Sequence, residues 1–171
     1  VHRLSDGVYL QRRNVAEATY IAHLVRQYLL DGPGMSLGIV AFSEAQQGCI
    51  EEALQALAKD DAAFAQRLDA ETLREDDDQF NGLFIKNLEN VQGDERDVML
   101  LSICYAPGPD GRMAMNFGPI NQRGGEKRLN VIFSRARHRI DTRLRPAVAE
   151  DDMDPAIENR LGHCVSRVRA S

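Results

Sequence analysis

The sequence lacks the long apolar stretch of a membrane protein and the cysteines of a disulfide-rich one. No run approaches the roughly 18 apolar residues of a transmembrane helix, and no signal-peptide pattern is present. The three cysteines lie far apart without a CxxC pair, and the four histidines are scattered, so neither a disulfide framework nor a metal site is expected. The simplest location for such a chain is a reducing compartment, the cytoplasm, away from membranes.

An excess of positive charge and a phosphate-binding loop are also missing. The 171 residues include 21 basic and 26 acidic side chains, a net charge of −5, whereas a free-standing nucleic-acid binder is usually basic overall. Neither GxxxxGKS nor GxxxxGKT occurs, so the chain has no Walker A loop of its own. With 43% apolar residues it can still bury the core of one ordinary domain, and a local basic groove is compatible with this composition.

Strand and helix patterns alternate along the chain. Short apolar runs bounded by turn residues predict strands over 8–10, 37–42, 83–85 and 98–103. Helical spacing predicts helices over 14–30, 43–57 and 126–140. Asn14 has Glu17 three residues later, as in a capping box, and Ser43 caps the second helix. This alternation favours an α/β fold with a parallel sheet whose faces are covered by helices.

Two stretches lack such a pattern. The acidic stretch 59–79 is interpreted as a solvent-facing helix and loop. Residues 106–125 hold five of the thirteen glycines and three of the six prolines, which predicts a long loop or hairpin. Long ordered loops in compact domains are often functional.

Three polar segments carry side chains suited to binding. The first, residues 92–97, precedes a predicted buried strand and contains Gly93, which allows a tight turn and a close approach of a ligand to the backbone. Its amide and carboxylate groups lie at an edge of the predicted sheet, where α/β folds bind ligands. The alternative is an ordinary polar surface turn.

The other two segments are rich in arginine. On the predicted helix 126–140, Arg128, Arg135 and Arg139 share one azimuth, and aligned guanidinium groups pair bidentately with phosphate oxygens. Arg12 and Arg13 precede the first helix, whose free backbone N–H groups favour an anion. The alternatives are a solvated basic helix face and an ordinary cap with solvent-facing arginines.

The order and spacing of these segments resemble the second RecA-like domain of superfamily 1 helicases. Residues 37–46 (LGIVAFSEAQ) resemble motif IV, 92–98 (QGDERDV) motif V, and 128–137 (RLNVIFSRAR) motif VI. The loop residues 116–121 (NFGPIN) are similar to the prokaryotic branch of the 5′-to-3′ subgroup. The resemblance implies a RecA-like P-loop NTPase fold over residues 1–140, with a parallel sheet flanked by helices and no Walker A loop of its own.

The resemblance also implies an ATP site. Arg135 takes the place of the arginine finger that reaches the γ-phosphate, an interaction that accelerates related phosphoryl transfers roughly 10³- to 10⁵-fold. Glu95 takes the place of the residue that accepts a hydrogen bond from the ribose, and Gly93 lets the backbone approach the nucleotide. Gln92 and Arg128 would support the site from its edge.

Other positions of the family pattern differ here. Val15 stands where the family often has a second phosphate-contacting arginine, for which Arg12 or Arg13 would substitute. Asn87 and Ser43 fall where the family contacts the nucleic-acid backbone, which gives affinity without sequence readout.

The resemblance further implies partners and a cofactor. ATP and Mg²⁺ would be bound mainly by an N-terminal RecA-like domain of the same polypeptide. Single-stranded nucleic acid would be the second partner, with DNA favoured over RNA. ATP would close the cleft between the two halves and hydrolysis would open it, so this chain by itself is expected not to hydrolyse ATP.

After motif VI, the family continues into an apolar strand that completes the sheet. Residues 139–146 (RIDTRLRP) do not have the pattern of a central strand. Residues 141–171 are therefore expected to be an atypical C-terminal tail that packs poorly.

Two other classes of function stay open. Val15 and Ala41 replace polar residues of the family, which fits a binding or scaffold module without ATP turnover. Asp94, Glu95 and Asp97 could instead bind Mg²⁺ in a nuclease, although a two-metal site needs carboxylates that converge from separate elements.

Overall fold

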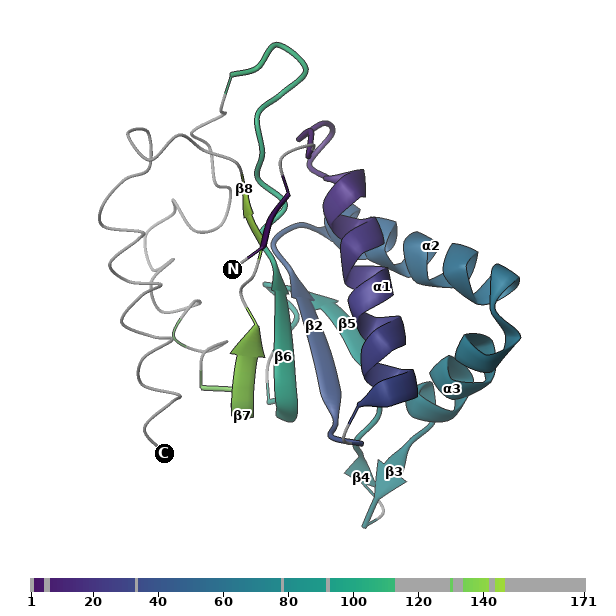
Figure 1. Ribbon diagram of the computed structural model, residues 1–171. Helices are drawn as coiled ribbons and strands as arrows, with labels where there is room; N and C mark the ends of the chain where they lie inside the picture. Colours follow the sequence, from purple (N-terminus) through teal and green to yellow (C-terminus); the bar gives the residue numbers. More distant parts are fainter. Residues whose placement is uncertain are drawn as a thin grey trace.

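The fold is built on a four-stranded parallel sheet in the order β5-β2-β6-β7 (Figure 1). The structure is a computed structural model that describes residues 2–4, 7–32, 34–77, 79–91, 93–112, 130, 134–141 and 144–146. The four strands are β2 (Leu37–Ala41), β5 (Phe84–Asn87), β6 (Arg96–Ser102) and β7 (Ala136–Asp141). Ile39 of β2 lies opposite Ile85 of β5 and Leu100 of β6. The predicted α/β fold with a parallel sheet is confirmed.

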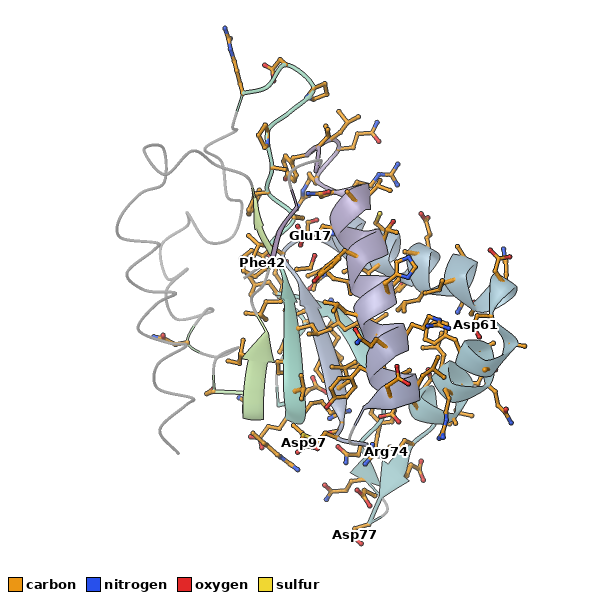
Figure 2. The ribbon with its side chains drawn as sticks, in the orientation of Figure 1. Glu17, Phe42, Asp61, Arg74, Asp77 and Asp97 are labelled. Carbon is orange, nitrogen blue, oxygen red and sulfur yellow. The ribbon has the colours of Figure 1, made fainter. Side chains whose placement is uncertain are left out.

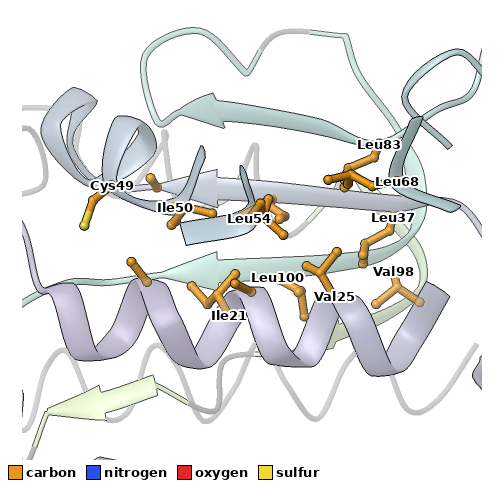
Figure 3. Packing of buried hydrophobic residues seen from close by; sticks show 14 of the residues in the cluster. Ile21, Val25, Leu37, Cys49, Ile50, Leu54, Leu68, Leu83, Val98 and Leu100 are labelled. Atoms are coloured by element: carbon orange, nitrogen blue, oxygen red, sulfur yellow. The ribbon is translucent and has the colours of Figure 1, made fainter. Parts of the chain in front are cut away.

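Three helices cover one face of this sheet (Figure 1). They are α1 (Val15–Asp31), α2 (Glu44–Asp60) and α3 (Ala62–Thr72). Their apolar side chains join those of β2 and β6 in one buried cluster (Figure 3), which includes Ile21, Val25, Leu37, Ile50 and Leu100. Burying one such side chain stabilises the fold by about 1.5–3 kcal/mol, so this layer fixes the helices on the sheet.

Helices α1 and α2 begin at the predicted caps. The Asn14 side chain accepts a hydrogen bond from the Glu17 backbone N–H at 3.1 Å. Ser43 Oγ accepts one from the Gln46 backbone N–H, also at 3.1 Å. Each bond satisfies a donor that the first turn of a helix leaves free. Among the described residues, no helix is both long enough and apolar enough to cross a membrane.

The acidic stretch 59–79 is only partly solvated, so the prediction of a wholly solvent-facing segment is wrong for α3. Phe64 is fully buried and Leu68 is 7% exposed, because both pack into the cluster formed with α1 and α2. The end of the stretch does lie in solvent. It forms an antiparallel hairpin of β3 (Glu75–Asp76) and β4 (Gln79–Phe80), both exposed.

Residues 8–10 do not form the predicted strand. Leu10 makes an isolated bridge to Arg13, and the turn between them places Gln11 and Arg12 at φ angles of 52° and 62°. The Tyr9 N–H donates to the Pro107 carbonyl at 3.1 Å. Within the described part of the chain, this apolar segment is therefore held by a turn and a loop and does not pair with a strand of the main sheet.

The predicted helix 126–140 is wrong in its last part, because Ala136–Asp141 is strand β7. Ile140 of β7 lies opposite Met99 of β6. The backbone groups at the edge of β6 pair with residues 136–141, and this pairing cannot be recognised from the local sequence pattern. Arg135 lies in a turn and Arg139 in a strand, so the proposed alignment of arginines on one helix face is wrong.

Residues 139–141 end strand β7, which lies at the edge of the main sheet and is not a central strand. β7 pairs with the outer side of β6, and β8 (Leu144–Pro146) pairs in parallel with β1 (His2–Leu4) in a separate two-stranded sheet. The loop predicted over 106–125 is irregular over 106–112. Its remainder and residues 147–171 lie outside the described residues, so the poor packing of that tail stays a prediction.

Candidate functional site

The predicted site residues divide between the two edges of the sheet. Because the four strands are parallel, their amino ends share one edge and their carboxyl ends share the other. Figure 2 shows Asp97 at the first edge and Glu17 and Phe42 at the second. The seven residues of β6 separate the edges by roughly 20 Å. The structure therefore brings Glu95 together with Arg135, and it leaves Arg12 at the far edge.

At the amino edge, Glu95 contacts two arginines. Arg135 Nη1 lies 3.4 Å from Glu95 Oε1, and Arg137 Nε lies 3.7 Å from Glu95 Oε2. The backbone supports this meeting, since the Arg96 N–H donates to the Arg135 carbonyl at 3.1 Å where β6 and β7 start. Arg137 was not among the predicted site residues, although the RAR sequence of motif VI places it two residues after the predicted finger.

Both charges of this pair are accessible to a ligand. The Glu95 side chain is 44% exposed and the Arg135 side chain 27% exposed. The buried Nε of Arg135 has no hydrogen-bond partner among the described residues. An exposed ion pair contributes about 0–1 kcal/mol, so a ligand could separate these groups at little cost.

Gly93 forms the turn that precedes Glu95. Its φ of +88° lies in the left-handed region, which glycine adopts without the strain of a Cβ atom. A Cβ atom here would meet nothing within 4 Å. The positive φ confirms the predicted tight turn, and the approach of a nucleotide to Gly93 stays a prediction. Gln92 and Arg128, also predicted at this site, lie outside the described residues.

Arg96 is a site residue that the sequence reasoning missed. It is 4% exposed, and its guanidinium carbon lies 5.2 Å and 4.9 Å from the ring centres of Phe80 and Phe84. Its nitrogens donate to the carbonyls of Gly82 at 2.9 Å, Glu95 at 2.7 Å and Phe80 at 3.4 Å. Burial lowers the pKa of Arg96 from its ordinary value. Arg96 therefore fixes the backbone that carries Glu95.

The carboxylates near this edge have separate partners. Asp94 Oδ2 accepts a hydrogen bond from Lys86 Nζ at 2.7 Å, and Asp97 Oδ2 accepts from both the N–H and the hydroxyl of Ser36 at 2.9 Å. Glu95 faces the arginines. Within the described part of the chain, these three carboxylates do not converge as a two-metal nuclease site requires.

At the carboxyl edge, a buried network surrounds Gln46. Its Oε1 accepts from the Asn14 N–H at 2.7 Å, and its Nε2 donates to Ser102 Oγ at 3.0 Å. The Ser102 hydroxyl donates in turn to Glu17 Oε1 at 2.7 Å, and the Cys104 N–H donates to the same oxygen at 3.0 Å. The network joins the start of α1, the start of α2 and the end of β6.

Glu17 has a different role from the one its sequence position predicts. Its carboxylate accepts hydrogen bonds from the end of β6 and the following loop, whereas the Asn14 N–H of the expected capping box donates to Gln46. Burial raises the pKa of Glu17 to about 7, against the opposing effect of hydrogen bonds from Ser102 and Cys104. No local signal marks this buried carboxyl.

The remaining predicted residues lie around this network. The Ser43 hydroxyl donates to the Arg12 carbonyl, and Ser43 is only 5% exposed. Arg12 is exposed and Arg13 is half-buried. Asn87, at the end of β5, accepts hydrogen bonds through Oδ1 from the N–H groups of Glu89 at 3.1 Å and Asn90 at 3.0 Å. These groups supply basic and amide side chains at the carboxyl edge.

The fold and the sequence together define a RecA-like α/β domain of the P-loop class without a Walker A loop of its own. The chain belongs to the AAA domain family, which matches residues 4–140.

Two curated relatives have names that state an activity. The chain is 36% identical over 143 residues to "Uncharacterized ATP-dependent helicase MG140" of Mycoplasma genitalium. It is 34% identical over 148 residues to "Uncharacterized ATP-dependent helicase MG140 homolog" of Mycoplasma pneumoniae. Each match covers 82% of this chain and 12% of the relative, so the chain spans about an eighth of their length. It is a helicase-like domain homologous to proteins named ATP-dependent helicases.

Proposed function

We propose that this chain is the C-terminal RecA-like motor domain of an ATP-dependent superfamily 1 helicase of the 5′-to-3′ subgroup. It contributes Arg135 and Glu95 to an ATP site that an N-terminal RecA-like domain of the same polypeptide completes, with Mg²⁺. The observation that carries the proposal is the meeting of these two side chains at the amino edge. The homology to proteins named ATP-dependent helicases supports it.

Arg135 is suited to stabilise phosphoryl transfer. Its guanidinium is permanently charged and has a buried donor without a partner in the described ranges. Directed at the γ-phosphate, it would neutralise charge that develops on the transferring group. Glu95 would exchange its arginine partners for the ribose hydroxyls of ATP. Nucleotide binding would then free Arg135 for catalysis at the moment when the ribose arrives.

The carboxyl edge is suited to a nucleic-acid strand. Arg12, Arg13 and Asn87 supply cationic and amide groups there, and such groups hold a phosphate backbone without reading sequence. The length of β6 separates Arg12 and Arg13 from Arg135, which favours strand contact over a second contact to the same ATP. Single-stranded DNA is the preferred substrate class of this proposal.

The test is the single-strand-stimulated ATPase rate of the full-length polypeptide. Arg135→Ala should lower the rate at least a hundredfold with ATP binding retained, an effect of about 2.7 kcal/mol on the barrier. Arg67→Ala, on the exposed surface of α3, is the matched control and should leave the rate unchanged. An unchanged rate for Arg135→Ala removes this residue from the chemistry. A wild-type polypeptide without ATPase activity favours the scaffold alternative.

A further inference from the structure

A groove of about 560 Å³ lies beside Glu95, between the β3–β4 hairpin and the turn before β6. The hairpin side includes Asp76, Gln79 and Phe80. The opposite side includes Glu95 and Arg137. The groove therefore opens directly onto a carboxylate that the proposed function assigns to the ribose of ATP.

Phe80 gives this groove an aromatic surface. The residue is 51% exposed, although the Arg96 guanidinium packs against its ring at 5.2 Å. Arg96 is itself anchored by three carbonyls, so the ring rests on a fixed support. A supported and half-exposed aromatic ring offers a stacking surface for a planar ligand, because every nucleobase has a π-face.

The charges of the groove select which part of a ligand fits. Asp76, Asp77, Asp94 and Glu95 line it, and Asp94 is neutralised by Lys86. Carboxylates repel phosphate but accept hydrogen bonds from hydroxyl and amino groups. The groove therefore suits an uncharged, donor-rich portion of a ligand. The arginine cluster at Glu95 lies next to it and suits the charged portion.

We propose that this groove is the nucleoside subsite of the ATP site, in which Phe80 stacks on the base while Glu95 accepts from the ribose. The phosphates then extend toward Arg135. This inference rests on the proposed function, and it adds the β3–β4 hairpin to the nucleotide site.

The test compares two ligands that differ only in the base, ATP and ribose 5-triphosphate. Their Kd values are measured by calorimetry on the full-length polypeptide with Mg²⁺. Phe80→Ala should raise the Kd of ATP about tenfold, which equals about 1.4 kcal/mol, and leave that of ribose 5-triphosphate within about twofold. Phe80→Trp should keep wild-type binding of ATP. Leu73→Ala, which truncates a 78% exposed apolar side chain outside the groove, is the control and should change neither Kd.

Each other outcome overturns the subsite. An equal rise in both Kd values shows that the ring acts only through Arg96 and the backbone of Glu95. Unchanged Kd values, or equal affinity of the wild type for the two ligands, show that the groove holds no base. Since the readout is binding, it is independent of turnover. If Arg135→Ala keeps the full ATPase rate while Phe80→Ala still weakens ATP binding selectively, the proposed function fails and the subsite stands. A polypeptide that binds neither ATP nor ribose 5-triphosphate contradicts both.

Discussion

Glu17 is a buried acid of the described residues whose surroundings disfavour its charged form. It is 3% exposed, and its hydrogen bonds come from the Ser102 hydroxyl and the Cys104 N–H, without a cation among the described residues in contact with it. Burial is the main reason why its pKa rises from 4.5 to about 7. The folded chain therefore binds a proton that the unfolded chain has released between these two pH values.

The sign of the resulting pH dependence follows from this difference in proton binding. The contribution of Glu17 to stability is fully present below pH 4.5 and is lost as the pH rises toward about 7. Glu17→Gln keeps an accepting oxygen but cannot ionise, so its free energy of unfolding should depend less on pH in this window. Between pH 5 and pH 8, the free energy of unfolding should fall by about 1–3 kcal/mol less for Glu17→Gln than for the wild type. Urea unfolding at the two pH values measures it.

A matched control separates this effect from the many other acids of the chain. Glu52→Gln removes an exposed carboxyl from α2 and should keep the wild-type pH dependence. Equal pH dependence of wild type and Glu17→Gln would show that Glu17 is charged in the folded chain throughout the window.

Single residues also show where sequence reasoning succeeds and where it stops. The resemblance to motifs V and VI assigned Glu95 and Arg135 to one ATP site, and Arg135 Nη1 lies 3.4 Å from Glu95 Oε1. Their role at such a site stays a prediction. The burial of Arg96 could not be predicted, because it depends on Phe80 and Phe84, which lie 16 and 12 residues earlier. An arginine between two carboxylates normally indicates a solvent-facing turn.

At the scale of elements, β2 and its neighbours are packed with almost no spare space. A Cβ atom on Gly38 of β2 would lie 2.6 Å from Phe84 Cζ and 2.8 Å from Met99 Sδ. These atoms belong to β5 and β6, the two strands that flank β2. Glycine at position 38 therefore leaves room for the side chains of Phe84 and Met99.

Gly38→Ala should therefore destabilise the chain by about 1–3 kcal/mol through overpacking. Phe84→Leu removes the nearest ring atoms, so the double variant should lose less stability than the two single variants added together. Chemical unfolding of the four proteins measures this coupling. Gly48→Ala is the control, because its Cβ would meet nothing within 4 Å and the position lies inside α2. It should be neutral or slightly stabilising.

The elements that could be predicted are those whose signals are local. The caps Asn14 and Ser43 mark the starts of α1 and α2, and apolar runs mark β2, β5 and β6. β7 escaped prediction because Ala136–Asp141 has no apolar run and becomes a strand only beside the free edge of β6. Residues 8–10 have an apolar run but no neighbouring strand of the main sheet to pair with.

At the scale of the whole molecule, the proposal assigns two different binding tasks to the two edges of the sheet. The amino edge holds the groups proposed for ATP, and the carboxyl edge holds those proposed for a nucleic-acid strand. Variants at one edge should leave ligand binding at the other edge intact.

The double variant Arg12→Ala, Arg13→Ala should weaken binding of the full-length polypeptide to single-stranded DNA without changing its Kd for ATP. Losing two phosphate contacts should make the dependence of log K on log salt shallower by about 1.4. Fluorescence anisotropy with a labelled oligothymidine at salt concentrations of about 50 to 200 mM measures this salt dependence. An unchanged slope would show that these arginines do not contact the strand, and Arg67→Ala serves again as the control.

Strand β6 is held by side-chain hydrogen bonds at both of its ends. Its first residue is anchored to the Gly82, Phe80 and Glu95 carbonyls, and its last residue is anchored to Glu17 and Gln46. Five of its seven residues in succession are buried. Because hydrogen bonds hold both ends of β6 and its middle is buried, we expect the strand to move together with the rest of the domain. If the proposed motor is correct, its movement is expected between this domain and the proposed N-terminal domain, and not within this sheet.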